Sequence, residues 1–303
     1  MQENPLVTII CLCFNHSNFV VESLNAVMNQ KYKNIELIIV DDCSTDDSIN
    51  TIQKWLIDHP TIPFIVHKNN LGNTKSFNNA LQFAKGEYII DLAADDVLLP
   101  ECVDLQIKAF QNSSYKNIGI VYGNAELISE KSIFDSYYFP VDSYQKVIKK
   151  RTTGDAYSSI LSGGDSLCSV SSMVKKSVFE DLNGYDESLA YEDLDFWIRA
   201  SRKYEFDFID EILVQKRIVT NSLGSHFFQK NNSNSKKINR STYTILKKAF
   251  QLNRSKVEDL ALQKRVHFEI ILCWKNKQYD LLLKNLSLIS RLTWRQVMTK
   301  NAF

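Results

Sequence analysis

Two pairs of aspartates lie where apolar runs of this 303-residue chain end. Asp41-Asp42 follows the run Ile35–Val40, and Asp95-Asp96 follows the run Tyr88–Ala94. Each run has the composition of a buried parallel strand, and open α/β sheets bind ligands at the carboxyl ends of their strands. Carboxylates crowded together repel one another unless a cation or hydrogen-bond donors lie between them. The pattern therefore predicts a site for a metal-held ligand that carries phosphate.

The first hundred residues alternate between strand and helix patterns, which supplies a framework for these aspartates. Alternation at these lengths predicts a mostly parallel sheet with right-handed crossovers and helices on its faces. We expect strands over 7–14, 35–40, 64–67 and 88–92, with helices over 18–30, 44–56 and 73–84.

After Pro100 the pattern is less regular. The stretch 126–155 has no clear period, so we expect a variable surface or a flexible flap there. The polar run 231–237 is expected to be a linker and is the best candidate for a domain boundary, and the chain beyond it has helical patterns. Further strands are expected over 118–122, 169–175 and 212–217, and further helices over 103–110, 176–182 and 194–201.

Composition and charge favour one large α/β domain with an appendage. The chain is 44% hydrophobic and 23% charged, which is enough apolar material for a sizeable core. Its net charge is +1, but residues 230–303 hold 16 Lys/Arg and 4 Asp/Glu, so they carry +12 and the rest carries −11. We therefore predict a catalytic domain over 1–229 and a basic helical extension over 230–303.

Targeting signals and disulfide patterns are not evident in the sequence. No apolar run approaches the roughly 18–20 residues that a membrane span needs, and the first residues lack the features of a signal peptide. The six cysteines are scattered, without CxxC or zinc-ligand spacing. We expect reduced thiols and a cytoplasmic protein, with peripheral attachment to the inner face of the cell membrane as a further expectation.

Several short motifs occur in a fixed order, and together they resemble family 2 glycosyltransferases over about residues 5–225. These are inverting enzymes of GT-A fold that use a nucleotide-sugar donor. The resemblance implies a Rossmann-like, mostly parallel sheet whose nucleotide-sugar half covers about 1–100 and whose acceptor half covers about 101–229. The motifs are Leu12-Cys13-Phe14-Asn15, Val40–Asp46, Asn70-Leu71-Gly72 with Asn78, Lys85–Ile89, Ala94-Asp95-Asp96, and Gly184–Glu187 with Glu192-Asp193.

The resemblance implies a nucleotide site at the ends of the first strands. Phe14 offers an aromatic face to a base, although a tyrosine is more usual there in the family. Asp42 is placed to accept a hydrogen bond from the N–H of uracil or a similar imide. The alternative is that Asp41 or Asp42 caps the next turn, and we expect one of the pair to cap and the other to bind the base.

Other residues of the implied nucleotide site are Asn15, Gly72, Lys75 and Asp95. Gly72 lets the backbone approach a ligand closely. Lys75 is within reach of a phosphate, but a solvated lysine is the simpler interpretation of that residue alone.

Asp95 and Asp96 match the acidic metal motif of the family, which is frequently Asp-x-Asp-Asp. In this chain Ala93 replaces the first aspartate of that motif. Oxygen ligands and a diphosphate favour Mn²⁺ or Mg²⁺, which would neutralise charge on the departing diphosphate. The alternative is an N-cap pair for a helix near Val97, which Pro100 would interrupt early.

A histidine that helps to hold metal or diphosphate in relatives is replaced by Val219 in this chain. His226, seven residues further on, is a candidate substitute metal ligand. A simply exposed histidine is the alternative.

Glu192-Asp193 is the third acidic constellation. By resemblance Asp193 is the general base that takes the proton of the acceptor hydroxyl, and Glu192 orients a loop or the acceptor. Asp195 and Arg199 have the spacing of a helical ion pair, and we expect Trp197 in the core. The assignment requires Asp193 to reach the same cleft as Asp42, Asp95 and Asp96.

The resemblance also implies acceptors that are glycans or lipid-linked saccharides of surface polysaccharide synthesis. The basic amphipathic extension would suit an anionic membrane surface, or its helices pack on the catalytic domain and on one another. We expect no nucleic-acid binding, because a basic-aromatic recognition motif is missing.

A second function remains open, namely a non-catalytic scaffold that binds a nucleotide sugar and recruits a partner or membrane through its basic tail. Ala93 and Val219 favour it. The retained Asp95, Asp96 and Asp193 count against it. A nicotinamide-dependent dehydrogenase is excluded, since Phe14-Asn15-His16-Ser17 contains no glycine.

Overall fold

The computed structural model describes residues 4–163, 167–219 and 233–298. They form two compact units, which we describe separately. The first comprises Met1–Gly154, Leu167–Tyr185 and Lys203–Val219, and the second comprises Asp155–Ser166, Asp186–Arg202 and Thr220–Phe303.

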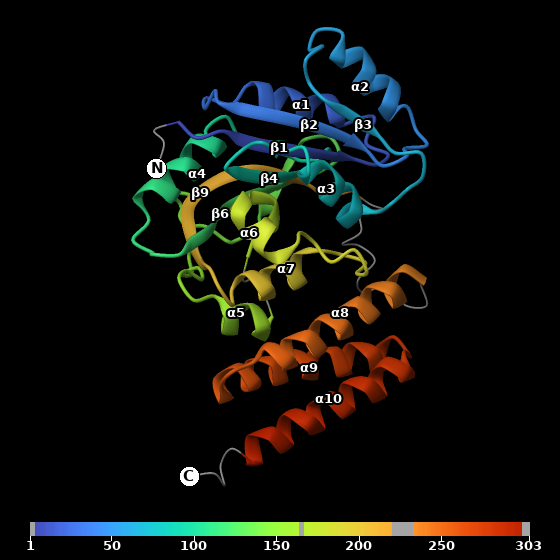
Figure 1. Ribbon diagram of the computed structural model, residues 1–303, viewed down its shortest axis with the longest axis vertical. Helices are drawn as coiled ribbons and strands as arrows, with labels where there is room; N and C mark the ends of the chain where they lie inside the picture. Colours follow the sequence, from blue (N-terminus) through green and yellow to red (C-terminus); the bar gives the residue numbers. More distant parts are fainter. Residues whose placement is uncertain (1–3, 164–166, 220–232, 299–303) are drawn as a thin grey trace. The chain divides into compact units, whose positions relative to one another are not determined.

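The first unit is built on one nine-stranded sheet (Figure 1). Its order is β3-β2-β1-β4-β8-β6-β9-β5, with β7 paired to β6. Strands β1 to β4 pair in parallel, as do β6 and β9, whereas β8 runs antiparallel to both β4 and β6. The strands are β1 (Val7–Cys13), β2 (Ile35–Asp41), β3 (Phe64–Val66), β4 (Tyr88–Ala93), β5 (Val97–Leu98), β6 (Ile118–Ile128), β7 (Phe134–Tyr137), β8 (Met173–Lys175) and β9 (Glu205–Arg217).

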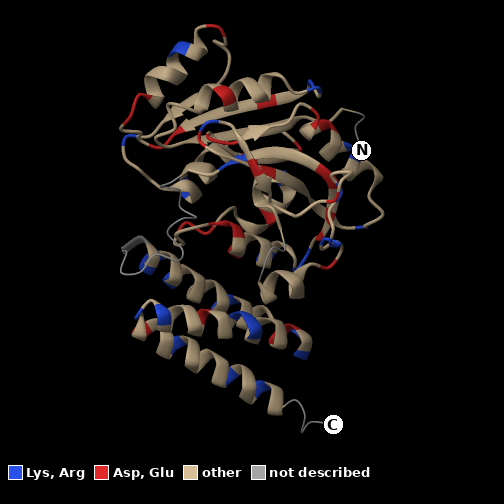
Figure 2. Cartoon of the chain, turned by 180° about the vertical axis from the view of Figure 1, so that it is seen from behind, with Lys and Arg blue, Asp and Glu red and all other residues tan. Residues whose placement is uncertain are grey.

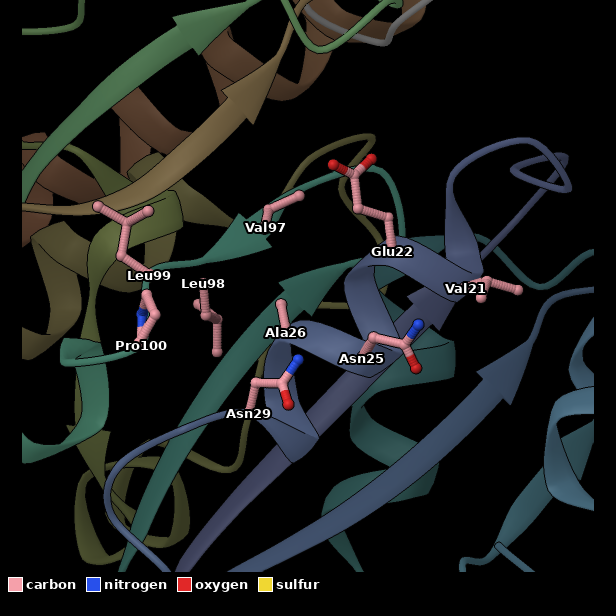
Figure 3. A pocket seen from close by; sticks show the side chains of 9 residues that line it. All are labelled: Val21, Glu22, Asn25, Ala26, Asn29, Val97, Leu98, Leu99 and Pro100. Carbon is pink, nitrogen blue, oxygen red and sulfur yellow. The ribbon is translucent and has the colours of Figure 1, made fainter. Parts of the chain in front are cut away.

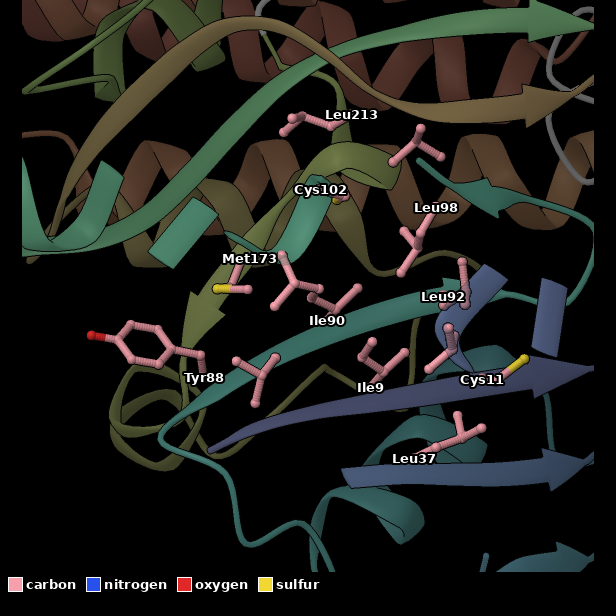
Figure 4. Close-up of a cluster of buried hydrophobic side chains, with 14 of the residues drawn as sticks. Ile9, Cys11, Leu37, Tyr88, Ile90, Leu92, Leu98, Cys102, Met173 and Leu213 are labelled. Atoms are coloured by element: carbon pink, nitrogen blue, oxygen red, sulfur yellow. The ribbon is translucent and has the colours of Figure 1, made fainter. Parts of the chain in front are cut away.

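Among the described residues, five helices belong with this sheet, and the core lies between the sheet and these helices. All seven residues of β1 are buried, as expected for a central parallel strand covered on both faces. Figure 4 shows Ile9, Ile90 and Leu92 among the side chains of this core. The helices are α1 (Val20–Met28), α2 (Ser48–Leu56), α3 (Asn73–Leu81), α4 (Cys102–Asn112) and α6 (Lys176–Leu182).

The second unit is helical. Its long helices α8 (Ser233–Leu252), α9 (Lys256–Lys275) and α10 (Tyr279–Met298) pack on one another, and the short helices α5 (Tyr157–Ser162) and α7 (Asp193–Ala200) pack on α9 and α8. Ser255 caps α9, because its side chain accepts a hydrogen bond from the backbone N of Glu258. Of the helices in the described ranges, none combines the length and apolarity needed to cross a bilayer.

The alternation predicted for the first hundred residues is confirmed, and each strand and helix predicted there is present. The short strand β5 is not predicted by the sequence pattern. The helix expected from residue 44 begins only at Ser48, because Asp46 accepts hydrogen bonds from the backbone N and Oγ of Ser48, at 3.0 and 2.5 Å, and so fixes a turn. The six cysteines are free, as expected.

Two expectations for the later part of the chain are wrong. The supposed flap from residue 126 begins as strand, because β6 continues to Ile128 and pairs with β7. The polar run 231–237 is helical from Ser233, where α8 begins. A domain boundary after residue 229 stays a prediction.

One buried cation connects four segments of the first unit. The Arg217 side chain at the end of β9 is fully buried, and it donates to the carbonyl O of Asp95 at 2.9 Å and to the Glu22 carboxylate at 2.6 Å. It also donates to the carbonyl O of Ser129 at 3.1 Å and to the Oγ of Ser132 at 2.9 Å. The guanidinium therefore ties α1, the turn after β4 and the β6–β7 turn to β9.

We predict that Arg217→Met lowers the free energy of unfolding by about 2–4 kcal/mol, because several part-buried hydrogen bonds from one buried cation are lost at once. Urea unfolding measures the change. The matched control is Lys31→Met, which removes an exposed ion pair with Glu101 and should lower the free energy by less than about 1 kcal/mol. Equal effects of the two substitutions would contradict the role of Arg217.

Candidate functional site

The register of the parallel strands brings the predicted nucleotide residues to one edge of the first unit. Cys13 of β1 lies opposite Asp41 of β2, and Leu12 lies opposite Ala93 of β4. The ladder continues one residue further, since the backbone N of Asp42 donates to the carbonyl O of Cys13 at 2.9 Å. The residues that follow these three neighbouring strands therefore lie at the same edge of the sheet. They are Phe14 and Asn15 after β1, Asp42 after β2, and Asp95 and Asp96 after β4.

Asn15 fixes the turn between β2 and α2. It adopts a positive φ of 59°, and its Oδ1 accepts a hydrogen bond from the backbone N of Thr45 at 2.8 Å. Its own backbone N donates to the Oγ of Ser44 at 2.9 Å. The neighbouring Phe14 is 42% exposed, so its ring is open to a ligand.

The two aspartates after β2 have different tasks. Asp41 accepts hydrogen bonds from the backbone N and the Oγ of Ser44, at 2.8 and 2.6 Å, and so caps the turn. Asp42 accepts from the backbone N of Leu71 and of Gly72, both at 2.8 Å, and its Oδ1 lies 3.0 Å from the Nδ1 of His67. The expectation that one member of the pair caps is confirmed, and Asp41 is that member.

These contacts keep Asp42 ionised. Burial favours its neutral form, but the hydrogen bonds from Leu71, His67, Gly72 and Ser76 outweigh burial and lower the pKa of Asp42. An ionised carboxylate is an acceptor only, so it suits the N–H of a base. Base binding by Asp42 stays a prediction. The sequence reasoning missed His67, whose only signal is its position directly after β3.

Gly72 and Lys75 mark the start of α3. Gly72 has a positive φ of 85°, and a Cβ built there would meet no atom within 4 Å, so a ligand has room to approach. Lys75 is exposed on the first turn of the helix. Their roles in nucleotide binding stay predictions.

The two aspartates after β4 also differ. Asp96 is buried and its Oδ1 accepts a hydrogen bond from the backbone N of Arg217 at 2.8 Å. Burial and the charge of Asp95 raise the pKa of Asp96. The Asp95 side chain retains 13% exposure, and its Oδ1 lies 3.8 Å from the Nδ1 of His16. The alternative of a helix cap is wrong, because Val97 begins strand β5.

The donor set around Asp95 suits a cation that is shared with a ligand. In the described part of the chain, no three His, Cys, Asp or Glu side chains gather into a metal cage. Mg²⁺ in phosphate sites is usually held by only one or two carboxylates, with substrate phosphates and water completing its shell. Asp95 fits that requirement better than Asp96, whose Oδ1 is engaged by Arg217. His226 lies outside the described residues.

The second unit carries the predicted base. Glu192 is the N-cap of α7 and Asp193 is its first residue, with its Oδ1 accepting a hydrogen bond from the backbone N of Leu194 at 2.7 Å. Helix α8 holds the preceding segment. The backbone N of Ala190 donates to the Oγ of Ser241 at 2.9 Å, and the hydroxyls of Tyr191 and Thr242 lie 2.8 Å apart.

Two local expectations for α7 are confirmed. Arg199 donates to the Asp195 carboxylate at 2.6 Å, and Trp197 is buried. Asp195 also accepts a hydrogen bond from the Nζ of Lys248 at 2.8 Å, which links α7 to α8. Because Asp193 and the strand-end aspartates belong to different units, their convergence on one cleft stays a prediction.

A hollow of about 500 Å³ in the first unit lies between α1 and the segment 97–100 (Figure 3). None of the predicted nucleotide, metal or base residues lines it. Its walls include Val21, Ala26 and Leu98, together with Glu22, the partner of Arg217. The hollow is therefore separate from the candidate site.

Comparisons with known proteins agree with this geometry. Residues 8–180 match the family model "Glycosyl transferase family 2". An uncharacterized glycosyltransferase of Methanocaldococcus jannaschii is 30% identical over 220 residues, which cover 71% of this chain and 72% of that protein. A second one, from Rickettsia typhi, is 30% identical over 218 residues, and the match spans 71% of this chain but only 64% of that relative.

Solved structures share the fold at low sequence identity. S. aureus TarS 1-349 in complex with UDP-GlcNAc has a TM-score of 0.69 at 15% identity, covering 95% of this chain and 81% of TarS. The mannosyltransferase PcManGT from Pyrobaculum calidifontis, in complex with GDP-Man and Mn²⁺, has a TM-score of 0.59 at 16% identity, with coverage of 98% and 84%. The predicted GT-A fold with a C-terminal helical region is thus confirmed.

The family model spans more than half of the chain, and its matched region contains the strand-end aspartates described above. This protein is therefore a glycosyltransferase that belongs to glycosyl transferase family 2.

Proposed function

We propose that this protein is an inverting enzyme that transfers a hexosyl or N-acetylhexosaminyl group from a nucleotide sugar to a hydroxyl of its acceptor. A UDP-sugar is the first donor to test, and the acceptor is a glycan or lipid-linked saccharide of surface polysaccharide synthesis. The observation that carries the proposal is the shared register of β1, β2 and β4, which sets Phe14, Asp42 and Asp95 at one edge of the sheet. Structural neighbours in complex with UDP-GlcNAc or with GDP-Man and Mn²⁺ support it.

In this proposal the first unit holds the donor. The exposed ring of Phe14 stacks on the base, and the ionised carboxylate of Asp42 accepts a hydrogen bond from the imide N–H of the base. Gly72 and Lys75 lie toward the phosphates. Asp95 holds Mn²⁺ or Mg²⁺, and the cation, when bound, supplies charge neutralisation to the diphosphate leaving group.

Asp193 acts on the acceptor. Its carboxylate takes the proton from the acceptor hydroxyl while that oxygen bonds to the anomeric carbon, on the face opposite the breaking bond to the diphosphate. The sugar passes through an oxocarbenium-like transition state. Glu192 orients the acceptor, and the contacts of Ala190 and Tyr191 with α8 hold both acids in place.

The second unit offers a surface that suits an anionic membrane at the inner face of the cell. A row of exposed residues, spaced three or four positions apart, runs along each of α9 and α10, and most residues in these two rows are apolar. The rings of Trp274 and Tyr279 meet edge to face at 6.2 Å, which joins the two rows at the turn between the helices. This α9–α10 stripe consists of Val257, Leu260, Lys264, Phe268, Ile271 and Trp274 on α9 and Tyr279, Leu283, Leu286, Ser290, Trp294 and Val297 on α10.

Charge supports a membrane as the occupant of this stripe. Figure 2 shows that Lys and Arg outnumber Asp and Glu along the three long helices. The four acids of residues 233–298 each pair with an arginine, whereas Lys264, Lys275 and Lys277 are exposed at the stripe. Aromatic and aliphatic side chains beside lysines are typical of surfaces that dock on anionic lipids.

A non-catalytic scaffold is the alternative function. It would use the same Asp42 and Asp95 to bind a nucleotide sugar and the same stripe to reach a membrane or partner. The two functions differ only in whether Asp193 is needed, so variants of that residue separate them.

We predict that Asp193→Asn lowers kcat about 10²–10⁴-fold because the general base is lost, while calorimetry finds the same Kd for UDP. The matched control is Asp280→Asn in the same unit, an exposed carboxylate whose loss should leave both quantities unchanged. Unchanged turnover in Asp193→Asn would favour the scaffold.

Divalent metal should strengthen donor binding. We expect UDP to bind at least about tenfold more tightly with Mn²⁺ than in EDTA, because the cation joins Asp95 to the diphosphate. Asp95→Asn should remove most of this difference. Equal UDP affinity in EDTA and in Mn²⁺, measured by titration calorimetry, would count against a metal-held donor.

Removing the stripe should release the protein from lipid. We expect the triple variant Trp274→Ser, Leu283→Ser, Trp294→Ser to cosediment at least about tenfold more weakly with phosphatidylserine-containing vesicles, because apolar burial and lysine attraction act together. The control is the double variant Ile57→Ser, Phe83→Ser of the first unit, whose side chains are about as exposed as the three replaced in the stripe. It should cosediment like the wild-type protein. A wild-type protein that ignores anionic vesicles would refute the membrane proposal.

A further inference from the structure

His16 is a side chain that the proposed reaction has not yet used. Its backbone is held firmly between β1 and α1. The backbone N of His16 donates to the Oγ of Ser48 at 3.0 Å, and its carbonyl O accepts from the backbone N of Phe19 and of Val20, both at 2.9 Å. The backbone of His16 is therefore fixed at the same strand end that places Phe14 and Asn15.

The imidazole presents one enclosed nitrogen that makes no hydrogen bond with any described residue. Nδ1 of His16 is inaccessible to solvent, and its nearest acidic neighbour is the Oδ1 of Asp95 at 3.8 Å. That separation exceeds a hydrogen bond. An enclosed polar atom without a hydrogen-bond partner is unfavourable, so a partner that reaches it would be stabilising.

A single cation can satisfy both atoms. Ligand bonds to Mn²⁺- or Zn²⁺-sized ions are about 2.1 Å long, so one ion can be shared by two ligand atoms up to about 4.2 Å apart. The Nδ1 of His16 and the Oδ1 of Asp95 fall inside that limit. A carboxylate and an imidazole, with a diphosphate to complete the shell, form a coherent donor set.

We propose that His16 is the nitrogen ligand of the divalent cation and acts beside Asp95. It would take the place of the histidine that the chain lacks at Val219, and His226 would not be needed. This inference rests on the proposed metal-dependent donor binding. A histidine ligand also implies a preference among metals, because imidazole suits transition metals whereas sites made of oxygen ligands alone suit Mg²⁺. Mn²⁺ should therefore bind better than Mg²⁺.

Pulsed EPR of Mn²⁺ tests the ligand directly, without a turnover measurement. With UDP and one equivalent of Mn²⁺, the wild-type protein should show electron spin echo modulation from a directly bound ¹⁴N. The modulation should disappear in His16→Gln and persist in His226→Gln. The exposed His267→Gln on α9 is the control for a change of histidine away from the site.

Affinity gives a second readout. His16→Gln should weaken Mn²⁺ binding in the presence of UDP at least about tenfold and bring the Mn²⁺ and Mg²⁺ affinities closer together. The free Mn²⁺ signal in continuous-wave EPR measures this, and circular dichroism confirms that the variant is folded. His267→Gln should bind Mn²⁺ as wild type does.

The outcomes separate the inference from the function on which it rests. Mn²⁺-dependent UDP binding without ¹⁴N modulation in the wild type overturns the role of His16 and leaves the proposed donor binding intact. The role of His16 is also overturned if the ¹⁴N modulation persists in His16→Gln and disappears in His226→Gln. UDP binding that is indifferent to Mn²⁺ in both the wild type and Asp95→Asn would refute metal-held donor binding itself.

Discussion

Backbone hydrogen bonds between β1, β2 and β4 set the register on which the candidate site depends. Cys13 opposite Asp41, and Leu12 opposite Ala93, bring the residues that follow each strand to one edge. Successive side chains of a strand point to opposite faces, so a slip of one residue would move every side chain to the other face. The apolar side chains of β1 are all buried and oppose such a slip. The core of the sheet therefore keeps the polar edge in alignment.

Charged groups close to this edge have local tasks as well as the proposed chemical ones. Asp42 holds the turn before α3 through the amides of Leu71 and Gly72, and Asp96 holds the end of β9 through the amide of Arg217. A buried ion pair is weak evidence for stability, since desolvation offsets much of the attraction. Arg217 is better understood as a positioning residue, because its donors fix the backbone carbonyls of Asp95 and Ser129.

The outline of the fold and the acidic pairs could be predicted from the sequence because their signals are local. Apolar runs followed by aspartates define β2 and β4, and periodic apolar residues define α1 and α3. The contacts of His16 and Arg217 could not be predicted, since their partners are distant in sequence; Arg217 and Asp95 are 122 residues apart. The two members of an Asp-Asp pair look alike in sequence, and only tertiary contacts distinguish the capping Asp41 from Asp42. The pairing of β6 with β7 is likewise non-local.

The hydrogen bonds between α8 and the segment before Glu192 determine how this chain can be truncated. Ser241 and Thr242 are the anchors for Ala190 and Tyr191, and Lys248 reaches both Asp186 and Asp195. A protein cut just after β9 would lose these three anchors of the segment 186–195. The helical end of the chain is therefore a structural support for that segment and not a detachable accessory.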